Sequence, residues 1–293
     1  TPRGPRGPSA WTTTLDYVRA HRGEFTYQDH GTPWSTVARN LDVIVGRPTS
    51  EYRGRASFSN GTIKIQNYEP MRADMHTTFR IVDGKILLNR VDLVTDGAES
   101  VLTGEVDAAH WPEQTYQITS SINFPRMREI FFARDTFSLF GDGGFQGTFH
   151  LFRETVNGRS RTGRELKGTF SSELAGVNDY RFGSLHGSLL WVPEKVEVTR
   201  ASASFYGGEA RFDYLMAPLG VPGVRFRHRF DAEYDDVDLT TYTNAFELEG
   251  LRLAGRATGR NLLEWPSGRW VDRRGGGTIG VEAPDGTELM TRR

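Results

Sequence analysis

Apolar and polar residues alternate along much of this chain, and residues 225–236 (RFRHRFDAEYDD) show the pattern most clearly. One set of alternate positions is largely apolar or aromatic: Phe226, His228, Phe230, Ala232 and Tyr234. The other set is charged: Arg225, Arg227, Arg229, Asp231, Glu233 and Asp235. Because successive side chains of an extended strand point to opposite faces, the alternation predicts a strand with one apolar and one charged face. A helix would instead spread the arginines around its whole circumference.

The same two-residue period recurs in short segments separated by Gly, Pro, Asn or Asp. The predicted strands cover residues 24–28, 36–45, 52–58, 61–66, 74–81, 85–95, 100–106, 115–124, 144–152, 166–174, 184–192, 195–205, 209–216, 225–236, 248–260 and 278–283. The pairs Asp83-Gly84 and Asp96-Gly97 are typical of tight hairpins and predict that the strands beside them are antiparallel neighbours. We therefore expect a mainly β fold built on a long, twisted antiparallel sheet.

A few short helices interrupt this pattern. In residues 9–21, Trp11, Leu15 and Val18 lie at helical spacing and Gly23 follows, which predicts an amphipathic N-terminal helix with a glycine stop. Residues 126–135 and 239–245 are predicted as two further short helices beside the sheet. Residues 1–8, rich in Pro, Gly and Arg, are interpreted as a linker.

The two internal helices divide the chain in a repeating way. Each follows a strand and precedes a glycine-punctuated segment, and the offset between them is about 110 residues, which suggests a multi-strand module used more than once. The predicted organisation is a linker and N-terminal helix (1–22), a first β module (23–124), a second (125–236) and the start of a third (237–293).

Composition and charge narrow the range of functions. Of the 293 residues, 37% are hydrophobic, the mean hydropathy is -0.51, and 33 glycines and 13 prolines accompany 12% aromatic residues, as expected of many short strands and turns. The formal net charge of -1 removes the electrostatic reason to expect nucleic acid as a partner. No cysteine is present, which excludes disulfides, thiol catalysis and thiolate metal sites.

No catalytic arrangement can be recognised. The seven histidines form no HxH or HExxH pattern, and His150 and His228 are interpreted as ordinary residues on the polar and apolar faces of their strands. Asp235 and Asp236 point to opposite faces of one strand, and Asp238 is expected to cap the following helix, so a glycosidase-like carboxylate pair is disfavoured. We expect no enzymatic activity, no catalytic residue, no metal and no cofactor.

The glycine runs and the tryptophans are explained by structural roles rather than by ligand binding. Residues 141–144 (GDGG) and 275–277 (GGG) lack the context of a phosphate-binding loop and are interpreted as turns or bulges. The tryptophans could line a sugar-binding platform, but several stand beside prolines at strand ends and are expected to pack at the rim of the sheet: Trp34, Trp111, Trp191, Trp265 and Trp270.

The apolar face of such a sheet must be covered, and three short helices are too few to cover it. A closed barrel, a two-sheet sandwich or a β-solenoid would cover it with the protein's own side chains, and large inward aromatics favour a sandwich. A sheet curled into an open groove would instead be covered by acyl chains, at about 25 cal/mol per Å² of buried area.

Four segments together resemble the AsmA-like/TamB superfamily of bacterial envelope proteins. They are residues 23–45 (GEFTYQDHGTPWSTVARNLDVIV), 83–107 (DGKILLNRVDLVTDGAESVLTGEVD), 204–214 (SFYGGEARFDY) and 236–259 (DVDLTTYTNAFELEGLRLAGRATG). The order of the segments carries the resemblance more than any single motif. The resemblance implies a β-groove fold in the Gram-negative periplasm, anchored to the inner membrane by an N-terminal helix. Because this chain begins at Thr1, we interpret it as a piece of such a protein without its anchor.

The expected function is that of a periplasmic bridge that shields lipid acyl chains during phospholipid transport between the inner and outer membranes. Its partners would be phospholipid acyl chains, the inner membrane and an outer-membrane protein at the far end, with no nucleic acid. A scaffold or chaperone for outer-membrane protein assembly, and a carbohydrate-binding or carbohydrate-active β protein, remain alternatives. The residues expected to line the groove lie on the apolar phase of their strands: Ile118, Ile122, Phe149, Leu151, Phe170, Phe212, Tyr214, Phe226, Phe230, Leu251 and Leu253.

Overall fold

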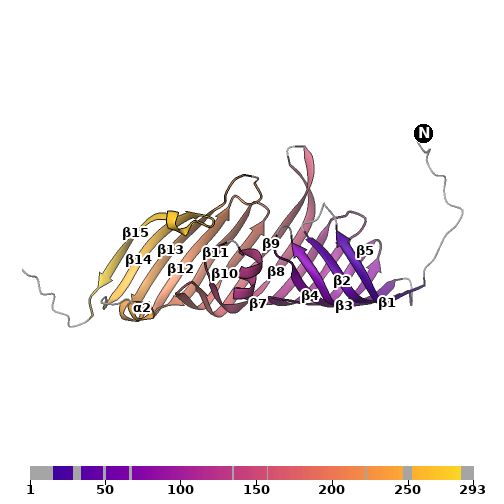
Figure 1. The fold of residues 1–293 in the computed structure, drawn as a ribbon, viewed down its shortest axis with the longest axis horizontal. Coiled ribbons are helices and arrows are strands. Elements are labelled where there is room, and N and C mark those ends of the chain that lie inside the picture. The colour runs from indigo at the N-terminus through magenta and orange to yellow at the C-terminus, as the bar shows by residue number, and fades with distance from the viewer. Residues whose placement is uncertain are drawn as a thin grey trace, which may run out of the picture.

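The structure, a computed structural model, describes residues 16–28, 34–48, 51–65, 68–133, 135–156, 158–221, 223–246 and 253–284. These residues form one antiparallel sheet of fifteen strands, in which spatial order follows chain order from β1 to β15 (Figure 1). The sheet is not closed into a barrel, and the described residues contain only two short α-helices. The predicted mainly β, antiparallel, open fold is confirmed.

The strands and helices have the following bounds. The strands are β1 (Tyr17–Gln28), β2 (Trp34–Gly46), β3 (Tyr52–Ile65), β4 (Met71–Val82), β5 (Lys85–Thr95), β6 (Ala98–Asp107), β7 (Gln114–Asn123), β8 (Leu139–Val156), β9 (Arg159–Val177), β10 (Tyr180–Val192), β11 (Lys195–Phe205), β12 (Gly208–Ala217), β13 (Arg227–Asp238), β14 (Arg256–Pro266) and β15 (Arg274–Glu282). The helices are α1 (Phe124–Phe131), α2 (Leu239–Ala245) and the 3-10 turn η1 (Trp270–Asp272).

The two-residue period gives the sheet two chemically different faces. Tyr214 of β12 lies opposite Phe230 of β13, which lies opposite Leu263 of β14. One position along, Leu215 lies opposite Arg229, which lies opposite Glu264. Directly opposed residues of antiparallel strands project to the same side, so these two rows lie on opposite faces. We call the face of Tyr214 and Phe230 the inner face and the face of Arg229 the outer face.

Bulges bend the sheet at positions where a residue adopts a positive φ. Asn60 (φ 55°) and Arg200 (φ 54°) each lie at a register shift between neighbouring strands. The backbone N–H of Asn60 donates to the carboxylate of Asp74 (2.6 Å), and that of Arg200 donates to Asp213 (2.8 Å). An extra residue increases the local twist and bend of a strand. An acidic side chain on the next strand therefore satisfies the N–H of each of these bulges.

The accumulated bend brings distant strands together at their ends. By their order along the chain, we call the ends near the β2–β3, β6–β7, β10–β11 and β14–β15 connections the upper rim, and the opposite ends the lower rim. Tyr27, at the lower rim of β1, packs against Trp111 at the upper rim after β6, with ring centroids 6.2 Å apart. In a flat sheet these strands would be roughly 24 Å apart, at about 4.8 Å per strand. The sheet therefore coils, with its inner face inside the coil.

Several predicted boundaries were wrong. The N-terminal helix is not formed in its described part: residues 17–21 belong to β1 and pair with β2, while Trp11 and Leu15 lie outside the described residues. Val18 opposes Val45 across that ladder, so strand pairing overrides the helical spacing. Gly23 lies at a register shift inside β1 rather than at a helix end. Residues 52–58 and 61–66 were predicted as two strands, but β3 is one strand with a bulge at Asn60.

The predictions for the two glycine runs had different outcomes. Residues 141–144 include a register shift between Gly141 and Gly144, which confirms the bulge. Residues 275–277 lie inside the edge strand β15, so the turn or bulge expected there was wrong. The predicted internal helices are present. Helix α1 begins two residues earlier than predicted, after the cap residue Asn123, and ends at Phe131 rather than at Asp135, so the predicted end was wrong; α2 has the predicted bounds.

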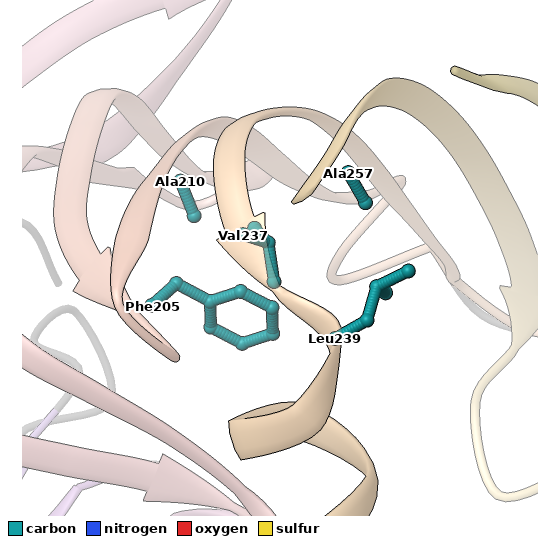
Figure 2. Close-up of a cluster of buried hydrophobic side chains, with 5 residues drawn as sticks. All are labelled: Phe205, Ala210, Val237, Leu239 and Ala257. Carbon is teal, nitrogen blue, oxygen red and sulfur yellow. The ribbon is translucent and has the colours of Figure 1, made fainter. Parts of the chain in front are cut away.

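The hydrophobic core consists of small patches rather than one layer. One patch joins β11 to β14 and α2 at the lower rim (Figure 2): Phe205, Ala210, Val237, Leu239 and Ala257. A second patch joins β2, β3 and β4: Ala38, Phe58 and Ala73. Among the described residues, Leu151 is the only large side chain that is fully buried. Most of the inner face therefore lies outside any sealed core.

Candidate functional site

The inner face is a continuous apolar surface across the C-terminal two thirds of the sheet. From β6 to β15 the residues of one row are directly opposed, strand by strand: Leu102, Ile118, Gly147, Gly168, Leu189, Val198, Tyr214, Phe230, Leu263 and Gly275. Because direct opposition is unbroken, every member of the row projects to the same face. The row contains no charged residue.

The structure places most of the predicted lining residues on this face. Eight lie on strands, in the row or an even number of positions from a member of it: Ile118, Ile122, Phe149, Leu151, Phe170, Phe212, Tyr214 and Phe230. Phe226 lies just before β13, with its ring 5.3 Å from that of His228. Leu253 lies before β14, outside any strand, and is 40% exposed; of the strand predicted at 248–260, residues 256–260 are formed as the start of β14 and residues 253–255 are not. Leu251 lies outside the described residues.

Most large side chains of the inner face are only half-buried. This holds for Ile118, Phe149, Phe170, Phe212 and Phe230. Of the eighteen described apolar residues that are buried, eight are alanines. No second layer of strands covers the face, since all fifteen strands belong to the one sheet. Exposed apolar surfaces of this extent are typical of ligand-binding or protein-binding sites.

A strap crosses the inner side of the sheet. We use this name for α1 with residues 132, 133 and 135–138, which connect β7 to β8. Phe131 packs edge-on against Tyr68, which precedes β4, and against Trp191 of β10, with centroid distances of 5.0 and 5.7 Å. Farther along, a carboxylate oxygen of Asp135 accepts hydrogen bonds from the Ser267 hydroxyl (3.0 Å) and the Gly268 N–H (3.1 Å). The strap therefore links the lower rim at β7 to the upper rims of β10 and β14.

Tyr214 and His228 form a polar pair on the inner face, close enough to Asp135 of the strap for its charge to affect His228. A hydrogen bond of 2.6 Å joins the Tyr214 hydroxyl and Nδ1 of His228, and the His228 ring stacks on Trp265 with centroids 4.8 Å apart. His228 is 2% exposed, and its burial lowers its pKa, an effect that nearby Asp135 partly opposes. Burial also raises the pKa of Tyr214. Both side chains are therefore neutral near pH 7, which suits an apolar surface.

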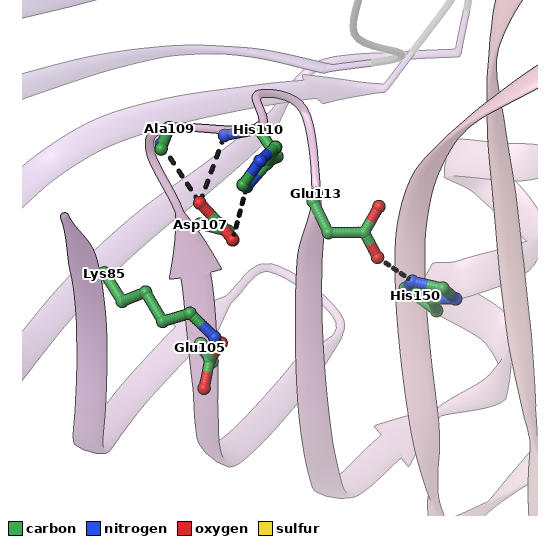
Figure 3. Close-up of polar contacts among 7 residues, drawn as sticks. All are labelled: Lys85, Glu105, Asp107, Ala109, His110, Glu113 and His150. Carbon is green, nitrogen blue, oxygen red and sulfur yellow. Dashed lines mark hydrogen bonds and ion pairs between the residues drawn. The ribbon is translucent and has the colours of Figure 1, made fainter. Parts of the chain in front are cut away.

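Ion pairs and other histidine contacts are concentrated at exposed positions. Figure 3 shows Glu113 paired with His150 at 2.6 Å and Lys85 with Glu105 at 2.5 Å. The inner-face position of His228 and the outer-face position of His150, opposite Thr115, are confirmed. Within the described part of the chain, no three His, Cys, Asp or Glu side chains come together as metal ligands.

The acidic residues near residue 236 have structural roles. Asp238 caps α2 by accepting a hydrogen bond from the Thr241 N–H at 2.8 Å, as predicted, and this bond lowers its pKa. Asp236 has a positive φ of 52° and lies at a register shift, where its N–H donates to the Thr258 hydroxyl (3.3 Å). The Asp238 carboxylate thus caps a helix, and the Asp236 carboxylate pairs with Arg256 at 3.5 Å.

The tryptophans lie at the rims, as predicted, in contact with other aromatic residues. Trp34 stacks on Tyr27 (4.6 Å), and Trp265 meets Trp270 edge-on (4.8 Å). Trp191 contacts both Tyr68 and Phe131. None of these rings forms a flat, isolated platform of the kind that stacks on a sugar.

The outer face has a recess of a different character. It has a volume of about 720 Å³ and spans β5 to β10. Its outer-face lining side chains are mainly hydroxyl-bearing and acidic, among them Asp92, Glu99, Thr119, Ser121 and Ser171. The apolar surface thus belongs to the inner face.

Sequence reasoning missed the polar atoms that the inner face leaves unpaired. Gln114 is 2% exposed and its Nε2 has no hydrogen-bond partner, and the indole Nε1 of Trp191 is likewise buried and unpaired. It also missed Arg164, which lies directly opposite Leu151 and hence on the inner face. A usable signal existed: Arg164 is the one charge on the apolar phase shared by Leu166, Gly168 and Phe170.

Comparison of the chain with family models, with curated proteins and with solved structures finds no match. Among the described residues, no helix has the length and apolar character needed to cross a bilayer.

Proposed function

We propose that the inner face holds the acyl chains of lipids and that the chain is part of a bridge for phospholipid between the inner and outer membranes. The observation that carries the proposal is the unbroken, uncharged inner row from β6 to β15, whose large side chains are half-buried and have no second protein layer over them. A surface of this kind is suited to a long apolar ligand without being specific for its length.

The energetics favour this ligand class. Each methylene moved from water to an apolar surface contributes roughly 0.8 kcal/mol, so about ten methylenes contribute roughly 8 kcal/mol. Directed contacts are not needed for such binding, which matches a row of Leu, Ile, Val, Phe and Gly. The charged outer face keeps the coil in water while the acyl chains lie inside it.

The proposed setting comes from the resemblance to the AsmA-like/TamB superfamily. The open, fifteen-stranded antiparallel sheet agrees with the groove that the resemblance implies. By the same resemblance, the protein would be periplasmic and held at the inner membrane, and an outer-membrane protein would receive the lipid.

Photo-crosslinking of paired positions tests the proposal. A photoreactive amino acid at Phe230 or Ile118 should capture phospholipid in cells, because both side chains lie on the inner face. The same amino acid at the adjacent positions Arg229 or Gln117 should capture little, because these residues face outward. Mass spectrometry of the adducts gives the readout. If the inner positions of the folded, exported protein yield no lipid adducts, lipid binding is excluded.

A second candidate function, assistance to outer-membrane protein assembly, is favoured by the edge strand β15. Among the described strands it pairs with β14 alone, and Ile279 and Val281 are 68% and 55% exposed. An open edge of this kind can accept an added strand from another protein. Crosslinks from Ile279 to β-strands of an outer-membrane protein, without lipid adducts at Phe230, would favour this function over transport.

A further inference from the structure

One arginine on the inner face, Arg164, forms no ion pair with the described residues. Arg164 of β9 lies opposite Leu151 and is half-buried. Its guanidinium lies 5.9 Å from the ring centroid of Trp191, on the neighbouring strand β10. No carboxylate or carbonyl of the described residues pairs with it, although most other charged side chains near it do pair.

The carboxylates in its neighbourhood are already bound. Arg161, three residues earlier, contacts Glu154 and Glu194, each at 2.6 Å. The largest influence on the pKa of Arg164 is burial, which lowers it. Glu194 opposes this only by long-range electrostatic attraction, without an ion pair to Arg164. Arginine nevertheless stays protonated in proteins. A positive charge thus faces the apolar side of the sheet without a counter-ion.

Two further hydrogen-bond donors lie around this charge. Tyr68 lies beside Trp191, with ring centroids 6.4 Å apart, and interacts electrostatically with Arg164. Its hydroxyl forms no hydrogen bond with the described residues, and burial raises its pKa, so it is an uncharged donor near pH 7. The indole N–H of Trp191 is buried and unpaired. Arg164, Tyr68 and Trp191 thus lie in one cluster beside the strap residue Phe131, and the described residues offer none of these three donors an acceptor.

Packing alone does not explain this arrangement. A half-buried, unpaired charge and an unpaired indole N–H both carry a desolvation cost that an apolar side chain would avoid. An anion that enters the site would remove both costs, because a guanidinium binds phosphate through two parallel hydrogen bonds. The neighbouring half-buried residue Leu166, directly opposite Trp191, would contact a hydrocarbon chain attached to that anion.

We propose that Arg164, Tyr68 and Trp191 form a headgroup site that binds the phosphodiester of a glycerophospholipid whose acyl chains lie along the inner face. This proposal rests on the proposed function, which it deepens by naming the ligand class. The site lies at the upper rim of β9 and β10, where the strap crosses and where a headgroup can remain next to water.

Binding of two lipids that share acyl chains but differ in the phosphate tests the site. Dioleoyl phosphatidylglycerol and dioleoylglycerol are titrated separately into the purified chain, and bound lipid is counted by native mass spectrometry. The wild-type protein should prefer the phospholipid by about tenfold, the gain expected of a charge-assisted hydrogen bond. Arg164→Met retains the length of the side chain without its charge and should abolish this preference while still binding dioleoylglycerol.

Matched variants separate this site from general effects. Arg211→Met removes an arginine from the outer face, where its side chain is 64% exposed, and should leave the preference unchanged. Tyr68→Phe removes only a hydroxyl and should reduce the preference about threefold. The strand signal in circular dichroism and the melting temperature establish that each variant is folded.

The possible outcomes are distinct. Equal preference in the wild-type protein and folded Arg164→Met overturns the headgroup site and leaves the proposed function intact. Failure of the wild-type protein to bind either lipid overturns the proposed function itself. Inorganic phosphate alone, titrated in a third arm, should bind far more weakly than phosphatidylglycerol, and equally tight Arg164-dependent binding of phosphate would overturn the lipid assignment.

Discussion

At the scale of the residue, curvature of the sheet depends on a recurring pair: a non-glycine residue with positive φ and a polar side chain on the next strand. Arg22 with Asp42, Asn60 with Asp74, Arg200 with Asp213 and Asp236 with Thr258 all follow this pattern. A left-handed conformation costs roughly 1–2 kcal/mol in a non-glycine residue. The hydrogen bond to the bulged N–H offsets part of that cost. It therefore fixes the position of the bulge along the strand.

Replacement of a bulge acceptor should therefore destabilise the fold. Asp213→Ala removes the acceptor of the Arg200 N–H and should lower the free energy of unfolding by about 1 kcal/mol, measured by urea denaturation. Glu209→Ala on the same strand breaks only an exposed ion pair with Arg211 and should have an effect below about 0.5 kcal/mol. Equal losses in both variants would contradict a special role for the bulge acceptor.

A single buried histidine should make stability depend on pH. Burial lowers the pKa of His228 in the folded state, so the unfolded chain binds a proton more readily. The neutral ring contributes stability that is present above the ordinary pKa of about 6.5 and is lost as the pH falls through the lowered folded pKa.

The measurement is urea denaturation between pH 7.5 and pH 5, at about half-unit steps, in the wild-type protein and in His228→Phe. The phenylalanine keeps the stack on Trp265 without a titratable group, so its stability should fall less over this range. Tyr214→Phe removes the hydrogen bond to His228 and leaves the titration in place. Parallel curves for the wild-type protein and His228→Phe would assign the pH dependence to other groups.

At the scale of the element, the strap determines how the coil is held. Helix α1 begins at the Asn123 cap, whose side chain accepts from the Arg126 N–H, and Pro125 fits its first turn. Beyond the helix, the Arg128 guanidinium donates to the backbone carbonyls of Asp135 and Phe137 and so holds the chain in place. The strap is thus a preformed unit whose outer end meets the upper rim of β14 through Asp135 alone.

Loss of the Asp135 hydrogen bonds should increase local opening of the β14–β15 connection. Asp135→Ala removes the acceptor of the Ser267 hydroxyl and the Gly268 N–H, so hydrogen exchange should become faster in peptides that cover 264–272. Glu129→Ala lies on the same strap but pairs only with Arg126 on the surface and should leave that exchange unchanged. Unchanged exchange in Asp135→Ala would mean that the strap does not fasten β14.

At the scale of the whole molecule, each strand contacts mainly the strand before it and the strand after it. Such a sheet behaves as a nearly one-dimensional array, whose stability is a sum of neighbouring interfaces. The few rim contacts, Tyr27 with Trp111 and Tyr68 with Phe131 and Trp191, link strands that are far apart in this array. They hold distant strands of the coil together.

Transport should therefore be sensitive to which face a charge occupies. Phe230→Asp places a carboxylate on the inner face, where an acyl chain would have to pass it, at a cost of several kcal/mol for an unpaired charge in hydrocarbon. Arg229→Asp changes a charge on the outer face and should cost little. Delivery of labelled phospholipid to the outer membrane in cells is the measurement, with protein level as the control. Equal transport by the two variants would refute passage along the inner face.

Strand identity, hairpin direction and face assignment could be predicted from the sequence, because they depend on local signals. The alternation in 225–236 assigned Phe230 and Arg229 to opposite faces. The pair Asp83-Gly84 predicted the β4–β5 hairpin, and both residues have a positive φ in the structure. The helix expected at 9–21 was wrong in its described part because pairing of Val18 with Val45 outweighs a weak helical spacing.

The coil, the strap contacts and the Arg164 site were decided only by the tertiary structure. Each depends on residues far apart in the chain: Asp135 meets Ser267 across 132 positions, and Tyr68 meets Trp191. Such contacts follow from a bend that accumulates strand by strand through the bulges, and a two-residue period contains no information about that bend. The sequence by itself determined which side chains share a face; the accumulated curvature determined which of them meet.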